Sequence, residues 1–547
     1  DEPELRVRDQ LRGKELVVIG GTGFLGKVWL SLLLSRVPEV GHVHLVVRPK
    51  EGLSVSERFT TKVLTSEVFA PLREQHGADF ERFVSSKVTP VPGDVSLPGC
   101  GLPDDLRARL VGRIGAVVNV AGIVDFDPPL DEALSVNAKG CQNLVALCRE
   151  LGDVPLLHTS TCFTAGSRTG FIAERDPRQI PFPAHERLPA GRWDPNREVA
   201  ECEGLVALAR RRFAEPAAQE RIRKEVDDEA DERGWSTDRR AEEHARRGPR
   251  LLRRQLAALG MERAKHWGWP NTYTYTKSLG EQLVANSGLP FTIVRPAIVE
   301  STLAFPSPGW NEGINTSSPF IFLIRQGGLQ IPGSQNNLDL IPCDLVCVAI
   351  LLALSELLEG RQRPVYQAAA SDLNPCSMAR FFELSGLHKR SLYEDGPRGS
   401  KVVSALQKRF ESFLLSKRAY EAYGPRRLGR GAELAQRALE KAARGPLQRA
   451  LQPVSRGLEA FASQQQRLAR VMDTFLPFVA EYQYVFSAAE VRRAFARLSP
   501  AEQELFPWHP DRIDWREWFL GIHAPALERH VFPEMEARLR RSVPPRA

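Results

Sequence analysis

The feature that most constrains the fold of this chain is a glycine-rich turn close to its start. Residues 16–26 read Leu-Val-Val-Ile-Gly-Gly-Thr-Gly-Phe-Leu-Gly. The four apolar residues that open this run indicate a buried parallel strand, and the apolar run 28–34 indicates a helix. A strand, a glycine turn and a helix in this order predict a dinucleotide-binding unit.

The three spaced glycines of the turn each have a physical reason. A side chain at Gly20 would block the tight turn, and one at Gly23 would hold a pyrophosphate away from the backbone. Gly26 allows the helix to approach the strand, so that the free N–H groups at the helix start face the phosphates. The spacing is similar to that of short-chain dehydrogenase-like domains, with a glycine-rich turn of an unrelated α/β fold as the alternative. We expect cofactor contacts from Gly20, Thr22, Gly23, Phe24, Leu25 and Gly26.

Length and composition bound the class of protein. A chain of 547 residues is expected to form two or three domains. The net charge of +7 is modest for this length, and no zinc-finger spacing or RNA-binding aromatic motif is present, so no nucleic-acid partner is expected. The eight cysteines are scattered without a Cys-x-x-Cys pair, which fits a reducing cytoplasm and no metal site. The oligomeric state stays open.

The ends of the chain and its apolar runs indicate a cytoplasmic protein. The N-terminus is charged and lacks the apolar core of a signal peptide. The most apolar long run, 341–354, contains Asp344 and is too short to span a bilayer. We therefore expect a protein that is at most peripheral to a membrane.

Charged residues after the next two predicted strands indicate which cofactor binds. The strand 43–47 ends at Arg48, where NAD-dependent proteins of this fold carry an acidic residue. A basic residue pairs with a 2′-phosphate, so we expect NADPH, with Arg58 as a second candidate clamp. The alternative is a solvated charge at a strand end. The strand 88–94 ends in Asp94, which we expect at the adenine amine together with Val95.

Two later segments carry the candidate catalytic groups. The predicted strand 116–122 contains small residues, including Ala121, that leave room for the cofactor ribose. The strand 154–160 delivers Thr161 to the carboxyl edge of the sheet, where doubly wound folds bind ligands. Tyr273 and Lys277 lie four residues apart and therefore on one face of a helix.

Three further segments complete the predicted reductase part. The predicted strand 288–299 contains Pro296, which we expect beside the nicotinamide. The segment 337–342, with Asp344, leads into a core helix that is predicted to extend to about residue 358. Asn137, ahead of the predicted helix 138–148, is interpreted as a cap, a packing amide or a site residue.

A charged segment interrupts the predicted reductase part. Residues 171–265 alternate Arg with Glu and Asp, which indicates solvated helices inserted near the mouth of the site as a lid or, equally, a surface elaboration. A shift in composition near 365–375 opens a mainly helical, aromatic-rich region. We therefore predict a Rossmann-type doubly wound parallel sheet of the extended short-chain dehydrogenase class in 1–370, and a helical substrate-binding domain in 371–547.

The C-terminal region contains a strongly basic stretch. Residues 401–450 carry twelve Lys and Arg against four acidic residues, interleaved with apolar residues. Such basic amphipathic helices lie on anionic bilayers, or pair with the phosphates of coenzyme A or with an acidic carrier protein. A solvated helix face is the alternative.

With these residues in view, the chain resembles the alcohol-forming fatty acyl-CoA reductases over nearly its whole length apart from 171–265. Departures are Cys-Phe-Thr after Thr161, where Ala-Tyr-Val is typical, and the large insertion. The resemblance is carried by Gly-Gly-Thr-Gly-Phe-Leu-Gly (20–26), Val-Asp-Phe-Asp-Pro-Pro-Leu (124–130), His-Thr-Ser-Thr (158–161), Trp-Pro-Asn-Thr-Tyr-Thr-Tyr-Thr-Lys (269–277), Ile-Val-Arg-Pro-Ala-Ile-Val-Glu-Ser (293–301), Pro-Gly-Trp (308–310), Ile-Pro-Cys-Asp (341–344) and Asp-Trp-Arg-Glu-Trp-Phe (514–519) with His523.

The resemblance implies a reaction and a role for each candidate residue. A long-chain fatty acyl-CoA, or an acyl carrier protein thioester, would be reduced by NADPH to the aldehyde and then to the primary alcohol. Thr161 and Tyr273 would hydrogen-bond the carbonyl oxygen, and Tyr273 would donate the proton. Lys277 would lower the pKa of Tyr273 and hold the nicotinamide ribose.

Four alternatives compete with this interpretation. Cys162 could form a covalent acyl intermediate, although the alternation of strand residues points it away from Thr161. The enzyme could release the aldehyde. The fold could serve an epimerase or a hydroxysteroid dehydrogenase. A non-catalytic protein that binds NADPH or a lipid surface is the fourth.

Overall fold

The computed structural model describes residues 2–180, 182–187, 193–314, 317–325, 330–332, 335–394, 413–442 and 446–542. At its centre lies a sheet of seven strands that are all parallel, in the order β3-β2-β1-β4-β5-β7-β11. The order reverses between β1 and β4, so the carboxyl ends of these two strands open a crevice. The strands are β1 (Glu15–Ile19), β2 (His42–Val47), β3 (Val88–Pro92), β4 (Ile114–Asn119), β5 (Leu156–Thr159), β7 (Phe291–Pro296) and β11 (Val365–Ala368).

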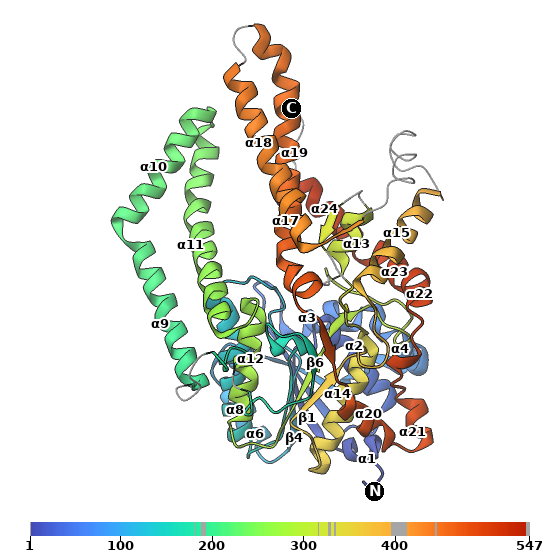
Figure 1. Cartoon of the computed structure of the whole chain (residues 1–547). Helices are drawn as coiled ribbons and strands as arrows, with labels where there is room; N and C mark the ends of the chain where they lie inside the picture. Colours follow the sequence, from blue (N-terminus) through green and yellow to red (C-terminus); the bar gives the residue numbers. More distant parts are fainter. Residues whose placement is uncertain are drawn as a thin grey trace.

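Helices cover both faces of this sheet, as the alternation within β1 shows. Leu16 and Val18 join one apolar core, and Val17 and Ile19 join the other, because successive strand residues point to opposite faces. The first core includes α2 (Phe24–Arg36) and α14 (Cys343–Glu359). The second includes α8 (Lys139–Glu150) and α12 (Thr272–Ala285). Figure 1 shows this layered centre in the lower half of the molecule, and the predicted doubly wound fold class is confirmed.

Short elements fill the connections on either side of the sheet. The helices are α1 (Val7–Leu11), α3 (Val55–Phe59), α4 (Ala70–His76), α5 (Phe80–Lys87), α6 (Asp104–Leu110), α7 (Leu130–Ala133) and α13 (Ser318–Arg325), with the π-helical η5 (Leu134–Ala138) and the 3-10 turn η6 (Cys162–Ala165). Short parallel pairs join β8 (Ile298–Glu300) to β10 (Leu340–Pro342), β9 (Gln330–Pro332) to β12 (Phe413–Leu415), and β6 (Gly170–Ile172) to β13 (Tyr484–Phe486).

Asn137 is not a helix cap. It lies inside η5, one residue before its end, and its side chain is buried. The Asn137 Oδ1 accepts from the backbone N–H of Ile123 at 2.9 Å, and Nδ2 donates to Thr276 Oγ1 at 3.2 Å. This amide therefore ties the loop after β4 to the helix α12.

The charged insertion forms an arm of three helices, α9 (Pro195–Ala214), α10 (Pro216–Arg233) and α11 (Thr237–Trp267), of which α10 and α11 project from the body (Figure 1, green). Its base packs on α12 through the buried Glu198. The Glu198 carboxylate accepts from Arg263 at 2.6 Å and from Trp267 Nε1 at 2.8 Å, and it also bonds the Tyr275 hydroxyl. The insertion therefore supports α12.

The C-terminal region is mainly helical, as predicted, and its first half contains a second projecting hairpin. Residues 401–412 and 443–445 of the predicted basic stretch lie outside the described residues. The helices are α15 (Met378–Glu394), α17 (Lys417–Tyr423), α18 (Pro425–Ala442), α19 (Pro446–Leu476), α20 (Ala489–Ala496), α21 (Pro500–Leu505), α22 (Trp515–Glu517), α23 (Ala524–His530) and α24 (Phe532–Ser542), with η8 (Pro477–Glu481) and η10 (Trp518–His523).

A buried ion cluster fastens this region to the sheet layer. The Glu356 carboxylate, on α14, is fully buried and accepts from Arg493 Nη2 at 2.6 Å. The same carboxylate also pairs with Arg497, whose Nη2 donates to Glu359 at 2.7 Å. Because a buried carboxylate needs its cations, the cluster holds α20 against α14.

We predict that Glu356→Gln lowers the free energy of unfolding by about 3 kcal/mol, because it leaves the buried Arg497 and the partly buried Arg493 without their carboxylate. Urea denaturation followed by circular dichroism measures this loss. Glu383→Gln is the control, since Glu383 pairs with Arg380 at the surface, and it should change stability by less than about 1 kcal/mol. Equal losses in the two variants would contradict the role given to the cluster.

Candidate active site

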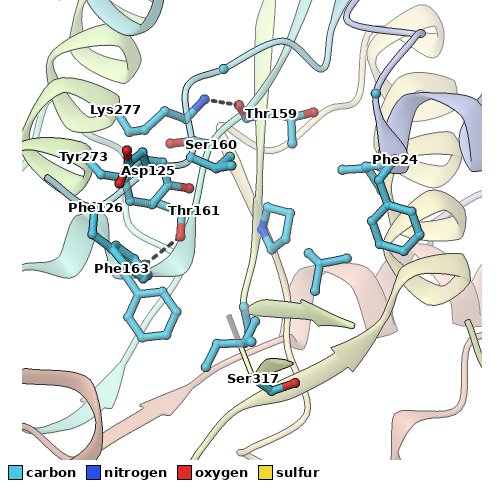
Figure 2. A pocket seen from close by; sticks show the side chains of 18 of the residues that line it. Phe24, Asp125, Phe126, Thr159, Ser160, Thr161, Phe163, Tyr273, Lys277 and Ser317 are labelled. Carbon is cyan, nitrogen blue, oxygen red and sulfur yellow. Dashed lines mark hydrogen bonds between the residues drawn. The ribbon is translucent and has the colours of Figure 1, made fainter. Parts of the chain in front are cut away.

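A cavity of about 610 Å³ lies at the carboxyl ends of the central strands. Figure 2 shows side chains that reach it from the ends of β5, from α12 and from the first turn of α2. Of the residues predicted from the sequence, those that line it are Gly20, Gly23, Phe24, Leu25, Gly26, Ala121, Thr161, Tyr273, Lys277 and Pro296. The sheet edge therefore brings together segments that lie up to about 280 residues apart in the chain.

The glycine turn has the geometry that the sequence predicts at Gly20 and Gly26. Gly20 has a positive φ of 89°, and a Cβ there would lie 2.4 Å from the backbone nitrogen of Ala121. A Cβ on Gly26 would lie 2.3 Å from the carbonyl oxygen of Gly20, so only glycine lets α2 begin this close to β1.

Gly23 is different, because it is exposed and a Cβ there would not clash with any atom. The atom nearest to a Cβ on Gly23 would be the carbonyl oxygen of Gly20, at 3.5 Å. Gly23 is also the N-cap of α2 and offers no side-chain hydrogen bond to the first N–H groups of that helix. These free donors and the adjoining space fit the pyrophosphate of a dinucleotide.

The two predicted arginine clamps meet at the ends of β2 and β3, outside the cavity lining. Arg48 Nε lies 2.8 Å from Asp94 Oδ2, and the Arg58 guanidinium bonds the Arg48 carbonyl oxygen. The Arg48 side chain is more than half exposed and thus accessible to a ligand. Thr22 and Val95 do not line the cavity either; Val95 is buried, and its carbonyl accepts from Asn143 Nδ2 at 2.9 Å.

Thr161, Tyr273 and Lys277 converge on one wall of the cavity (Figure 2). Lys277 Nζ donates to the carbonyl oxygen of Thr159 at 2.6 Å, which ties α12 to the end of β5. Thr161 caps the turn η6, where its Oγ1 accepts from the backbone N–H of Phe163 at 3.3 Å. The Thr161 hydroxyl, on the same wall as Tyr273, acts to lower the pKa of that phenol.

The acidity of Tyr273 differs from the prediction. Burial raises the pKa of Tyr273 to about 12, and the hydrogen bond with Thr161 only partly offsets this effect. Lys277 was expected to lower the pKa of Tyr273, but burial sets the direction of the shift, and the Lys277 ammonium group bonds the Thr159 carbonyl oxygen instead. Burial also lowers the pKa of Lys277 from its ordinary value. Tyr273 is therefore a neutral phenol at physiological pH and a hydrogen-bond donor to the cavity.

Of the two tyrosines in the segment 269–277, only Tyr273 lines the cavity. The Tyr275 hydroxyl points into the insertion, where it meets Glu198 and lies 3.2 Å from Cys202 Sγ. This split follows from helix geometry, because residues two positions apart lie on nearly opposite faces of α12.

Cys162 and Arg295 face away from the cavity. Cys162 Sγ donates to the Arg295 carbonyl oxygen at 3.0 Å, and burial raises the pKa of its thiol well above the ordinary value. Cys162 does not line the cavity with Thr161, as expected, but it begins the turn η6 and does not continue a strand, so strand alternation is not the reason. Arg295 forms a buried ion pair with Glu281 at 2.6 Å, so of the Arg-Pro pair only Pro296 lines the cavity. All eight cysteines are free.

An aromatic wall, which the sequence analysis did not identify, encloses the side of the cavity next to Tyr273. The Phe126 ring lies 5.8 Å from the Tyr273 ring and 5.3 Å from the rings of Phe475 and Phe478. Phe163 packs edge-on against Phe478 at 5.0 Å. Phe475 and Phe478 come from the end of α19 and from η8. Phe126 and Phe163 lie in segments quoted for the family resemblance, but only the aromatic content of the C-terminal region pointed to Phe475 and Phe478, and it carries no position.

The insertion does not close the cavity. Among the described residues of 171–265, none lines it. The lid interpretation is therefore not supported by this structure.

Together, the parallel sheet, the glycine turn and the Tyr-Lys pair define an NAD(P)-binding reductase with a fold like that of the extended short-chain dehydrogenases. A family profile described as "Male sterility protein" matches residues 18–350, more than half of the chain. The chain therefore belongs to the fatty acyl-CoA reductase family.

Similar proteins extend over nearly the full chain. Fatty acyl-CoA reductase 8 of Arabidopsis thaliana is 28% identical over 539 residues, which covers 95% of this chain and 98% of that protein. The alcohol-forming fatty acyl-CoA reductase of Simmondsia chinensis is 28% identical over 534 residues, with the same coverage. Among solved structures, the terminal R domain from the myxalamid PKS-NRPS biosynthetic pathway has a TM-score of 0.55 at 15% identity, over 95% of this chain and 92% of that chain. This last likeness supports the fold alone.

Proposed function

We propose that this protein reduces long-chain fatty acyl-CoA with NADPH, through the aldehyde, to the primary fatty alcohol, and releases coenzyme A. The observation that carries the proposal is the placement of the Thr161 and Tyr273 side chains at one wall of a cavity that also borders the glycine turn. A carbonyl bound at that wall would lie beside both hydroxyl groups, in the cavity that the glycine turn also borders.

The proposed chemistry assigns one task to each side chain. A reduced nicotinamide, when bound, supplies a hydride to the carbonyl carbon. Negative charge then grows on the carbonyl oxygen, and the Tyr273 and Thr161 hydroxyls stabilise it by hydrogen bonding. Tyr273, a phenol with a pKa of about 12, is protonated at the start of each turnover and gives its proton to this oxygen, which yields a hemithioacetal. The C–S bond of the hemithioacetal then breaks, the hydroxyl proton leaves with coenzyme A as its thiol, and the aldehyde stays for the second reduction. Lys277 holds the end of β5 in place and binds the ribose.

The aromatic wall supports an apolar acyl chain as the substrate. Phe126, Phe163, Phe475 and Phe478 surround the reaction wall, and Phe320 extends this surface at 4.7 Å from Phe475. Burying an acyl chain against such rings contributes roughly 0.8 kcal/mol for each methylene group. The exposed Arg48, with Arg58 bound to its carbonyl, supports recognition of the 2′-phosphate of NADPH.

A covalent acyl-cysteine route is disfavoured by the position of Cys162. Its thiol is fully buried, donates to the backbone at Arg295 and is held protonated by its surroundings. A thiol in this state is neither accessible nor nucleophilic. The hydride is therefore proposed to attack the bound thioester directly.

We predict that Tyr273→Phe lowers kcat by about 10²- to 10⁴-fold, because it removes the proton donor. Binding of NADPH, measured by fluorescence titration, should change little. Tyr275→Phe is the matched control, since its hydroxyl points into the insertion; it should keep near-normal kcat even if its stability falls. Near-normal turnover by Tyr273→Phe would refute the assignment of the acid.

The cofactor preference has its own test. Arg48→Ala should raise the KM for NADPH by about 10- to 100-fold, the loss of one charge-assisted contact, and leave the KM for NADH nearly unchanged. Steady-state kinetics with both cofactors measures this. Arg82→Ala is a suitable control, because Arg82 is exposed and pairs with Asp79 at the surface. An equal rise for the two cofactors would argue against a 2′-phosphate contact.

The product distinguishes the proposed alcohol-forming reaction from an aldehyde-releasing one. We expect two NADPH consumed for each thiol released from palmitoyl-CoA, because the aldehyde stays in the cavity for a second reduction. Absorbance at the nicotinamide band and a thiol reagent measure the two quantities in parallel. A ratio of one would identify a thioester reductase that stops at the aldehyde, and no thiol release would reject the function.

A further inference from the structure

The hairpin of α18 and α19 exposes a surface that is both basic and apolar. It rises from the body of the molecule at the top of Figure 1, in orange. Gly429 and Ala432 lie on the side of α18 toward α19, since a Cβ on Gly429 would contact Gln465 and Ala462. The opposite side of α18 carries the exposed Arg427, Arg430, Leu434 and Arg437, which recur at helical spacing.

Large apolar side chains are exposed on this hairpin and beside it. Tyr423 is 72% exposed and Leu434 is 65% exposed, with arginines on either side of Leu434. Five of the twelve large apolar residues exposed in the described part of the chain lie between residues 423 and 461: Tyr423, Leu428, Leu434, Val454 and Phe461. Such a concentration indicates a surface that is covered by a partner.

The charge of the hairpin decides which kind of partner fits. Residues 425–476 contain ten basic and four acidic residues, a net +6 in a chain of net +7. Arg426 pairs with Asp473, whereas Arg427, Arg430 and Arg437 have no carboxylate partner among the described residues. The other projecting arm, residues 195–267, has seventeen basic and fifteen acidic residues, many of them in ion pairs. Of the two projecting arms, the α18–α19 hairpin is therefore the one whose described residues are both basic and apolar on the outside.

The same hairpin is continuous with the cavity. The last turn of α19 and the following η8 supply Phe475 and Phe478 to the aromatic wall. A surface on the outer part of the hairpin is thus connected, through one helix, to the wall against which an acyl chain would lie.

We propose that the α18–α19 hairpin docks on an anionic lipid bilayer, with Arg427, Arg430 and Arg437 toward the headgroups and Leu434 inserted between them. Arginines at an anionic surface and an apolar side chain at the acyl boundary are the two contacts that such a helix makes. Docking would place the cavity next to the phase in which long acyl chains and fatty alcohols partition. This last consequence rests on the proposed function, but the docking itself does not.

The test measures binding to vesicles without cofactor or substrate. The full chain should co-float with vesicles of phosphatidylcholine mixed with phosphatidylserine and not with pure phosphatidylcholine, and added salt should weaken the binding. The triple variant Arg427→Gln/Arg430→Gln/Arg437→Gln should bind about 100-fold more weakly, from three lost headgroup contacts. Leu434→Ser should also weaken it.

The matched control removes the same charge elsewhere. Arg211, Arg212 and Arg254 are exposed on α9 and α11, and their replacement by glutamine should leave vesicle binding unchanged. Equal losses in the two triple variants, or no binding by the unmodified chain, would overturn the proposal. The proposal would also be overturned if the Arg427/Arg430/Arg437 triple variant bound vesicles normally but lost binding to an acidic acyl carrier protein. Both triple variants should turn over water-soluble octanoyl-CoA at the same rate, because the substituted residues lie outside the cavity. If the unmodified chain binds vesicles but has no turnover, the proposed function is rejected and the docking proposal stands.

Discussion

The site depends on one hydrogen bond, from Lys277 Nζ to the carbonyl oxygen of Thr159. It joins the middle of α12 to the last residue of β5, so that Tyr273 on the helix and Thr161 after the strand lie at the same wall. Burial lowers the pKa of Lys277, and the nearby Cys141 and Glu281 oppose this effect. The positions of the Tyr273 and Thr161 hydroxyls therefore depend on where β5 ends.

Two regions outside the sheet secure this arrangement, each by a buried carboxylate. Glu198 of the insertion accepts hydrogen bonds from Arg263 and Trp267 and meets Tyr275 on the far side of α12 from the cavity. Glu356 joins α20 of the C-terminal region to α14, and the same region supplies Phe475 and Phe478 to the aromatic wall from α19 and η8. The insertion thus supports the catalytic helix from behind, while the C-terminal region shapes the space for the substrate.

Local patterns predict the sheet edge well and the cavity walls poorly. Gly20 and Gly26 were predicted from their spacing in the sequence. The structure gives the reason for that spacing, because a Cβ at Gly20 or Gly26 would lie 2.4 Å or 2.3 Å from a backbone atom. Tyr273 and Lys277 followed from helical spacing. Phe475 and Phe478 could not be predicted, because their place depends on how α19 packs some 200 residues after α12. The predicted shift in the pKa of Tyr273 was wrong in direction, because burial raises this pKa and the spacing between Tyr273 and Lys277 does not reveal burial.

The central claim is that one carbonyl meets Tyr273, Thr161 and the nicotinamide together. A crystal structure with NADP⁺ and an amide analogue of palmitoyl-CoA tests it most directly. The account predicts the analogue's carbonyl oxygen within about 3 Å of both hydroxyl oxygens, and its carbon about 3–3.5 Å from the nicotinamide ring. A carbonyl bound away from Tyr273, with the acyl chain outside the aromatic wall, would contradict it.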